Sequence, residues 1–401
     1  MFFRNYSVSY SLLRRLMPAL IRATLWTAVR MSPPAWIAML RISLRRSLVW
    51  LPHKLRQWRT GLAMPVTLTI IDDIGCRAAC ANCVFTAFRV RGERLSLQDV
   101  DRVLDQALQM NITNVYMLGA DPFYRPDIDA FLDVLAKHKY QFFLLFTEGK
   151  KITPAHVARI RRAGNIIPVL NIDGLQEASD RRKGEGTFRV VDELLALLRK
   201  ERVLFGVTCM ASQANFDEVS GPAFARYLDE QGASFLAYVP YTPVDRKAEA
   251  GLVLDGPKRD ELFERSMQLN HEVRRLAVFD MLGIEQKLTS CPAGVYSITV
   301  YHDGTVTPCV AVPAGHQTSN VKTRSLMDIF TNDPLYVAMR QRHQALARRN
   351  RQRGTEEKIH CMFYTDTAFL RGYFAQHRPD IRVLAPYAID YLDPEQPGGD
   401  S

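Results

Sequence analysis

From about residue 64 onward, short β-prone apolar runs alternate with longer segments in which apolar residues recur every three or four positions. The first pattern predicts buried strands and the second predicts amphipathic helices. The predicted strands are 65–72, 113–118, 141–147, 167–173, 203–210 and 234–240, and the predicted helices are 97–108, 127–138, one opening at 153–154, 187–200, 222–231 and 257–276. Repeated strand–helix units imply parallel strands with right-handed crossovers. Six repeats instead of eight predict an α/β fold built on an open, partial (β/α)6 TIM-like barrel.

The pattern changes near residue 286. Segments 296–301 and 305–310 alternate apolar and polar residues around Asp303-Gly304, which predicts a β-hairpin. The elements expected after it are helices at 325–330 and 334–348 and a charged surface turn at 348–353. The chain therefore divides into a basic amphipathic helical segment (1–62), the partial barrel (63–285) and a small α+β C-terminal extension (286–401).

The net charge of +10 is concentrated in the first of these parts. Residues 1–60 contain eleven arginines and lysines and no acidic residue, whereas the rest of the chain is balanced at 41 basic and 42 acidic residues. A nucleic-acid partner is not expected, because the basic excess is confined to one segment and does not give the protein a generally basic surface. All four tryptophans, Trp26, Trp36, Trp50 and Trp58, lie in the same segment. Tryptophan and arginine mixed with leucine are typical of helices at a membrane interface.

A helical wheel separates arginines from apolar residues in this segment. At about 100° per residue, Arg22 and Arg30 fall on one side and Met17 and Ile21 on the opposite side. No charge-free run reaches the roughly 18 residues that a spanning helix needs. We expect the segment to lie on an anionic membrane surface, with the protein cytoplasmic and peripheral on the inner face of the membrane. Docking of these helices on the protein's own surface and organellar targeting remain open as alternatives.

Three closely spaced cysteines follow the first predicted strand, as Cys76-x3-Cys80-x2-Cys83. Thiolates are the usual ligands of iron–sulfur clusters, and three ligands leave one iron of a four-iron cluster open for chemistry. Loops at the carboxyl ends of parallel strands are also where βα folds place active sites. The alternatives are a zinc knuckle, for which no fourth Cys or His occurs between residues 54 and 137, and unrelated buried cysteines. Seven cysteines without a secretory signal argue against a complete disulfide framework.

This cysteine loop resembles that of the radical S-adenosylmethionine (SAM) superfamily, and the resemblance covers about residues 64–285. It implies a 4Fe–4S cluster whose open iron binds the amino and carboxylate groups of SAM. An electron from a reductant such as flavodoxin or ferredoxin would then split SAM into methionine and a 5′-deoxyadenosyl radical, which abstracts a hydrogen atom from the substrate.

The resemblance also implies a SAM-binding motif after the second strand. The family usually has Gly-Gly-Glu-Pro there, which bonds the amino group of SAM, and this chain has Gly119-Ala120-Asp121-Pro122. Aspartate keeps the carboxylate that would accept the hydrogen bond, but its side chain is shorter than that of glutamate. Two further matches are Thr147-Glu148-Gly149, where the family has Thr-Asn-Gly, and Asn171-Ile172-Asp173-Gly174, which fits the fourth-strand pattern.

Three single residues are further candidates for SAM binding by the same resemblance. Arg182 is a candidate for the SAM carboxylate, and its alternative explanation is an exposed arginine in a basic turn. Asn215 is a candidate for the ribose hydroxyls. Phe85 would replace the aromatic residue that often precedes the third cysteine, a position that Asn82 occupies here.

A second set of cysteines lies in the C-terminal extension. Cys291-x12-Gly304-x4-Cys309 resembles the opening of SPASM and twitch extensions, in which glycine permits the hairpin turn between two cluster ligands. Because full SPASM domains carry a further run of four cysteines and only Cys361 remains here, the extension resembles the twitch type. The resemblance implies an auxiliary 4Fe–4S cluster on Cys291, Cys309 and Cys361. The alternative is a hairpin that has kept its shape without a metal.

Other candidates are weaker. Cys209 lies within an apolar strand and is expected to be a buried core thiol. His302 and His360 are expected to be surface histidines. Asp173 and Tyr241 lie at strand ends facing the expected cavity, and either is a candidate for exchanging a proton or hydrogen atom with the substrate.

The sequence therefore predicts a radical SAM enzyme on a membrane surface, acting on a substrate of lipid or isoprenoid type. A peptide or protein maturase is the first alternative. A non-catalytic iron–sulfur membrane scaffold is an alternative of another class.

Overall fold

The computed structural model describes residues 10–74, 80, 81, 83, 85, 94–242, 250–287, 291–353 and 367–385. Within them, nine strands form one sheet in the order β7-β6-β5-β4-β3-β2-β1-β8-β9. The barrel strands are β1 (Thr67–Ile71), β2 (Asn114–Leu118), β3 (Phe142–Thr147), β4 (Ile166–Asn171), β5 (Gly206–Ala211), β6 (Phe235–Pro240) and β7 (Ala277–Asp280). The helices among them are α3 (Leu97–Gln109), α4 (Ile128–Lys137), α5 (Pro154–Ala163), α6 (Gln176–Lys183), α7 (Thr187–Lys200), α8 (Phe216–Val219), α9 (Pro222–Gln231), α10 (Gly256–Glu272) and α11 (Met281–Lys287).

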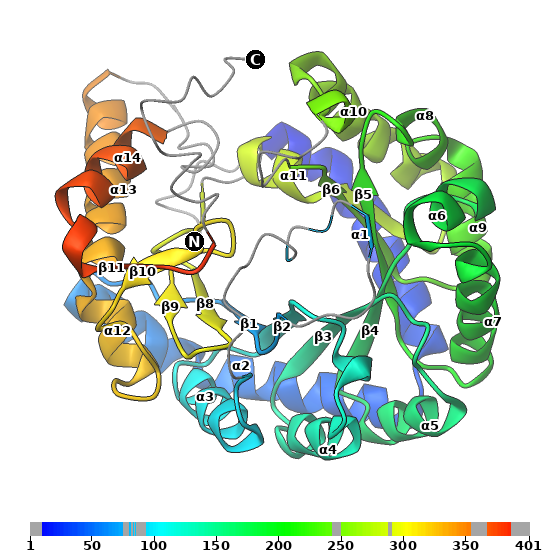
Figure 1. Ribbon diagram of the computed structural model, residues 1–401, viewed down its shortest axis with the longest axis horizontal. Coiled ribbons are helices and arrows are strands. Elements are labelled where there is room, and N and C mark those ends of the chain that lie inside the picture. The colour runs from blue at the N-terminus through cyan, green and yellow to red at the C-terminus, as the bar shows by residue number, and fades with distance from the viewer. Residues whose placement is uncertain are drawn as a thin grey trace.

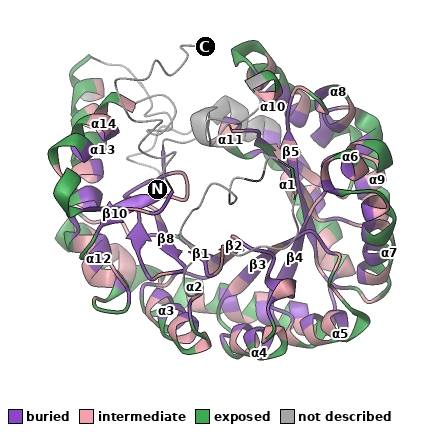
Figure 2. Ribbon diagram, viewed as in Figure 1, coloured by how far each residue is buried: buried purple, intermediate pink, exposed green. Residues whose placement is uncertain are grey.

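Each barrel strand pairs in parallel with the next strand along the chain. The sheet curves around an open centre and its helices cover the outside (Figure 1). Buried residues follow the strands, while the outer faces of the helices are exposed (Figure 2). The predicted partial barrel is thereby confirmed.

The helix boundaries follow from local signals in the sequence. Ser96 caps α3, because its Oγ accepts a hydrogen bond from the backbone N–H of Asp99 at 3.0 Å. The apolar side of the same helix, which includes Val100 and Leu104, is buried in one cluster with Leu68 of β1. Cap and apolar stripe together fix where the helix begins and which side faces the sheet.

Several parts of the fold differ from the sequence prediction. Strand β7 and helix α6 were not predicted, and the helix expected at 257–276 ends at Glu272. Asn270 of α10 holds strand β7 in place, because its Oδ1 accepts a hydrogen bond from the Val278 N–H at 2.9 Å. The charged turn expected at 348–353 is instead the last part of α13, because arginine is a good helix former.

The C-terminal extension continues the barrel sheet. Its elements are β8 (Ser297–Tyr301), β9 (Val306–Thr307), β10 (Ala314–His316), α12 (Leu326–Asn332), α13 (Pro334–Arg353), α14 (Thr367–Gln376) and β11 (Ile381–Val383). Strand β8 pairs in parallel with β1, opposite β2, and antiparallel with β9. Gly304 turns this predicted hairpin with φ +90°, and an added Cβ would lie 2.5 Å from Asn320 Oδ1. The ends of β1 and β8 therefore lie side by side.

The N-terminal helices α1 (Tyr10–Arg30) and α2 (Pro33–Thr60) run behind the strands (Figure 1). Arg46 of α2 donates to Thr113 Oγ1 at 2.6 Å, directly before β2 begins. Arg202, which precedes β5, donates to the carbonyls of Val29 and Met31 at the end of α1, at 3.1 and 3.2 Å. Both helices therefore cross the amino ends of the barrel strands and dock on the protein itself.

An amphipathic helix is expected to turn its apolar side toward the protein and its arginines toward water, but α1 has Arg22 on the docked side. Arg22 faces the barrel and donates to the carbonyls of Val273 and Arg274 at 3.0 and 3.1 Å, just past the end of α10. Helix ends carry unsatisfied carbonyls and partial negative charge, so a guanidinium stabilises them. Met17 and Ile21, on the apolar side, are 41% and 52% exposed. Among the described residues, no helix combines the length and apolar character needed to span a bilayer.

We expect Gly164→Ala to lower the free energy of unfolding by about 2–4 kcal/mol, since it adds backbone strain and overpacking. Gly164 ends α5 at φ +73°, and an added Cβ would lie 2.4 Å from the carbonyl carbon of Pro34 in α2. Gly61→Ala is a matched control, because Gly61 has φ +67° and nothing within 4 Å. Urea unfolding followed by tryptophan fluorescence measures both variants. Equal losses in the two would contradict the close approach of α2 to α5.

Candidate active site at the carboxyl ends of the strands

The backbone after β2 packs directly on the segment that leads into the cysteine loop. The N–H of Ala120 donates to the Asp73 carbonyl at 2.8 Å. Gly119 has φ +111°, and an added Cβ would lie 2.4 Å from the same carbonyl oxygen. A side chain at this position is excluded, so the glycine of the predicted motif is required for the two loops to meet.

Two of the three predicted cluster cysteines lie in the described residues, and Cys76 lies outside them. Cys80 and Cys83 are both partly buried. Burial raises the pKa of the Cys80 thiol and Glu148 adds to this, while the cations of Lys183 and Arg182 oppose it. Thiols with cations close by are a suitable donor set for an anionic iron–sulfur cluster. The described residues therefore fit the expected cluster.

Arg182 joins the cysteine loop to β4. Its Nε donates to the Ala81 carbonyl at 3.2 Å, and its Nη1 donates to Asn171 Oδ1 at 3.0 Å and to the Asp173 carboxylate. Burial lowers the pKa of Arg182, but Asp173 and the thiols of Cys80 and Cys83 outweigh it and raise the pKa overall. The arginine therefore contacts the cysteine loop and does not lie in an exposed basic turn.

Asp173 is fully engaged by protein groups. It accepts from Arg182, from Lys183 Nζ at 3.1 Å and from the Met210 N–H at 2.8 Å. Burial raises its pKa, but Lys183 and Arg182 outweigh this and hold the pKa below its ordinary value. An ionised carboxylate held by two cations orients Arg182 and is a poor proton donor.

Asp121, the predicted acceptor for the SAM amino group, is directed into the protein. Its Oδ1 accepts from the Phe123 N–H at 3.0 Å, and its Oδ2 accepts from Thr147 Oγ1 and the Glu148 N–H, each at 2.9 Å. Burial raises the pKa of Asp121 to about 6 in spite of these bonds. The carboxylate caps the short helix Pro122–Tyr124 (η2) and ties it to the end of β3.

The carboxylate beside the cysteine loop belongs to Glu148, directly after β3. Its Oε2 lies 3.9 Å from Cys80 Sγ and 3.6 Å from Lys150 Nζ, and Tyr124 donates its hydroxyl to Oε1. The side chain is only 3% exposed. The sequence placed Glu148 in a recognised motif without giving it a role, because its match in the family is an uncharged asparagine.

The remaining candidates for SAM binding, Asn215 and Phe85, and the catalytic candidate Tyr241 fall at three different places. Asn215 is held by backbone groups, since its Nδ2 donates to the carbonyls of Asp173 and Met210, each at 2.9 Å. Tyr241 is buried directly after β6, and its N–H donates to the Ala211 carbonyl at 2.7 Å. Phe85 packs against the apolar cluster of the C-terminal extension. The structure brings Arg182, Asp173 and Asn215 together, and Phe85 lies on the other side, toward the extension.

Two of the predicted auxiliary ligands share that apolar cluster, and Cys361 lies outside the described residues. Cys291 is buried and Cys309 is partly buried. The N–H of Ala311 donates to Cys309 Sγ at 3.5 Å. An amide directed at a thiol in apolar surroundings suits a cluster ligand. Within the described residues, no group of three His, Cys, Asp or Glu side chains forms a complete metal site.

Two other expectations have clear outcomes. Cys209 is fully buried in β5, as expected. His302 is not a surface histidine, since it is fully buried after β8 and neither ring nitrogen has a hydrogen-bond partner within the described residues. Burial lowers its pKa, which favours the neutral imidazole. His360 lies outside the described residues.

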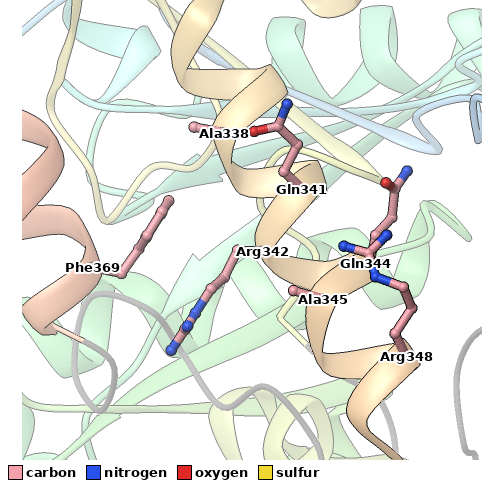
Figure 3. A pocket seen from close by; sticks show the side chains of 7 residues that line it. All are labelled: Ala338, Gln341, Arg342, Gln344, Ala345, Arg348 and Phe369. Atoms are coloured by element: carbon pink, nitrogen blue, oxygen red, sulfur yellow. The ribbon is translucent and has the colours of Figure 1, made fainter. Parts of the chain in front are cut away.

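A surface hollow lies apart from this site, between α13 and α14 (Figure 3). Arg342 and Phe369 line it from the two helices, with the guanidinium 5.9 Å from the ring centroid. Of the predicted site residues that the structure describes, none lines the hollow.

Comparison with known families decides the class. The radical SAM superfamily profile matches residues 73–211, and the profile of the SPASM iron–sulfur cluster-binding domain matches residues 291–354. The chain belongs to the radical SAM superfamily of enzymes. The first domain implies a 4Fe–4S cluster and SAM, and the SPASM domain implies auxiliary clusters. The SPASM match ends before Cys361.

Two curated relatives are maturation proteins by name. The mycofactocin maturase MftC of Mycolicibacterium smegmatis is 26% identical over 138 residues, which are 34% of this chain and 35% of the relative. The sporulation killing factor maturation protein SkfB of Bacillus subtilis is 23% identical over 265 residues, 63% of this chain and 62% of the relative. The chain thus spans between about a third and two thirds of the length of these relatives.

Solved structures support the fold of this radical SAM protein. Streptococcus suis SuiB superposes with a TM-score of 0.63 at 18% identity, covering 72% of this chain and 71% of SuiB. The enzyme anSMEcpe superposes with a TM-score of 0.54 at 16% identity, covering 83% of this chain and all of the other. Both likenesses concern the fold alone.

Proposed function

We propose that this protein is a peptide or protein maturase that cleaves SAM at a 4Fe–4S cluster and abstracts a hydrogen atom from its substrate. The observation that carries the proposal is the contact of the cysteine loop, through Ala81, with the ion pair of Arg182 and Asp173 at the carboxyl ends of the strands. When bound, the cluster and SAM supply a carbon radical capable of taking a hydrogen atom from an unactivated carbon.

The protein's own residues bind and orient SAM in this proposal. Arg182, fixed by Asp173, presents a partly buried guanidinium that suits the carboxylate of SAM. Glu148 provides a buried carboxylate against Cys80, where the positively charged part of SAM would be stabilised. We assign this role to Glu148 and not to Asp121, because three protein donors already occupy the Asp121 carboxylate.

A peptide substrate is favoured over the lipid or isoprenoid expected from the sequence. The relatives named above are a mycofactocin maturase and a killing-factor maturation protein. Other solved structures hold SuiB bound to precursor peptide SuiA, and anSMEcpe with AdoMet and a peptide. A low-potential protein such as flavodoxin or ferredoxin is the proposed reductant.

A lipid-like substrate is the second candidate, because apolar side chains of α1 and α2 are exposed. These helices cross the amino ends of the strands, whereas the SAM-site residues follow the carboxyl ends. A bilayer bound by α1 and α2 would therefore contact the side of the barrel away from the SAM site. This geometry weakens the idea that the helices deliver a membrane substrate to the site.

Deuterium transfer distinguishes the two substrate classes. Reduced enzyme with SAM is incubated with deuterated cytosolic peptide extract or with deuterated total lipid extract, and 5′-deoxyadenosine is analysed by mass spectrometry. We expect deuterium in 5′-deoxyadenosine from the peptide extract, because the maturase abstracts substrate hydrogen. Transfer from the lipid extract alone would contradict the peptide proposal.

A further inference from the structure

The docked N-terminal helices carry most of the exposed apolar surface in the described part of the chain. Fourteen large apolar side chains exposed there belong to α1 and α2, and five belong to the rest of the described residues. The fourteen are Met17, Ile21, Leu25, Trp26, Val29, Trp36, Ile37, Leu40, Leu44, Leu48, Trp50, Leu51, Leu55 and Trp58. We call these side chains the outer apolar face. A concentration of this kind marks an interaction surface, whereas single exposed apolar residues do not.

The outer apolar face is regular along both helices. On α1 it includes Met17, Ile21, Leu25 and Val29, which are four residues apart and share one side of the helix. On α2 most of its members recur every three or four residues, as Ile37, Leu40, Leu44, Leu48, Leu51, Leu55 and Trp58. The other side of each helix is buried on the barrel, through Leu16, Ala19 and Ala23 on α1 and Ala35, Ala38 and Ile42 on α2. Docking therefore leaves this face uncovered by the described residues.

The charge around the face indicates what covers it. The first 71 residues contain no acidic side chain. Arg22 and Arg46 are used in docking, and Arg56 donates to Met327 Sδ at 3.4 Å. Arg59 of α2 is exposed beside Trp58 of the outer apolar face. Apolar residues, tryptophans and cations together suit an anionic lipid surface. A second copy of the chain suits it less, because a two-fold contact would bring two acid-free segments together.

We propose that the outer apolar face binds the surface of an anionic membrane and that the SAM site then faces the aqueous phase. The second half rests on the proposed function, since it concerns the strand ends assigned to SAM. Docking at the amino ends of the strands leaves the carboxyl ends away from the lipid. The enzyme would be peripheral on the membrane and take its substrate from the water side, which agrees with a peptide substrate.

Intrinsic tryptophan fluorescence tests the binding directly, because all four tryptophans lie in α1 and α2. The full chain is titrated with vesicles of phosphatidylcholine containing phosphatidylglycerol and with vesicles of phosphatidylcholine alone. We expect a blue shift and quenching by brominated lipid with the anionic vesicles, and binding at least about 10-fold weaker to the neutral ones.

The double substitution Leu44→Glu and Leu48→Glu should weaken vesicle binding at least about 10-fold, because two side chains 62% and 69% exposed no longer enter the lipid. Val190→Glu is the matched control, at an exposed position of α7 outside the face, and should bind as wild type does. Unchanged melting temperatures show that both variants fold. Equal vesicle binding by wild type and the double variant, or no binding by either, overturns the proposal.

Hydrogen–deuterium exchange tests the orientation independently of activity. On anionic vesicles, peptides from α1 and α2 should gain protection, while peptides covering 119–125 and 147–150 should exchange as in solution. Protection at the strand-end loops would overturn the orientation. A wild-type dimer that ignores vesicles and dissociates in the double variant would assign the face to a second copy and overturn membrane binding. Neither result depends on SAM cleavage, so the proposed function is tested separately.

Discussion

Replacing Cys76, Cys80 and Cys83 together with alanine is expected to abolish 5′-deoxyadenosine formation. The open iron that activates SAM needs three thiolates, and without them the cluster has no ligands at this site. The measurement is 5′-deoxyadenosine by liquid chromatography after anaerobic reconstitution and reduction. Cys209→Ala is the matched control, because Cys209 is fully buried in β5 and its pKa is raised well above the ordinary value by burial. A buried neutral thiol is not a cluster ligand, so the control should retain SAM cleavage.

Iron content separates the catalytic cluster from the auxiliary cluster in the same variant. If Cys291 and Cys309 hold a second 4Fe–4S cluster, the triple variant should retain about half of the wild-type iron. Loss of all iron would mean that the extension keeps its hairpin without a metal. Formation of 5′-deoxyadenosine by the triple variant would contradict the assignment of the cysteine loop. A wild-type protein that binds iron but never cleaves SAM would support the non-catalytic scaffold.

The elements that the sequence predicts well have both a recognisable start and an apolar periodicity within their own residues. Helices α7 and α9 have the predicted bounds, because each joins a clear start to an apolar stripe long enough to show its period. Strand β7 was missed because its four residues are too few to show a period, and its position depends on Asn270 in the preceding helix. Contacts of this kind are tertiary and leave no local pattern.

The site divides in the same way. The cysteine loop is recognisable from its spacing, and glycine is required at position 119 because an added Cβ would lie 2.4 Å from the Asp73 carbonyl oxygen. The sequence does not reveal which carboxylate lies against the cysteines, because that depends on side-chain length and on competing hydrogen-bond donors. Asp121 is one methylene shorter than glutamate and is engaged by Thr147 and two backbone amides. Likewise, the wheel of α1 separates arginines from apolar residues but does not tell which side docks.

We expect Glu148→Gln to weaken SAM binding by roughly 10- to 100-fold, the loss for a hydrogen bond between charged groups worth about 1.5–3 kcal/mol. Glutamine keeps the shape of the side chain and its bond to Tyr124 but removes the negative charge beside Cys80. Equilibrium dialysis of labelled SAM against the reconstituted protein measures this without turnover. Iron content should stay at the wild-type level, because Glu148 is not a cluster ligand in this assignment.

Asp121→Asn provides the contrast that decides between the two carboxylates. Asparagine offers one acceptor oxygen where the Asp121 carboxylate accepts from three donors, so one buried amide or hydroxyl loses its partner. An unsatisfied buried donor costs about 1–3 kcal/mol, so the main effect should be a lower melting temperature. SAM affinity of the folded Asp121→Asn protein should fall less than that of Glu148→Gln. If Asp121→Asn loses SAM and Glu148→Gln binds it normally, the acceptor is the residue after the second strand, as in the family motif, and the role assigned to Glu148 is wrong.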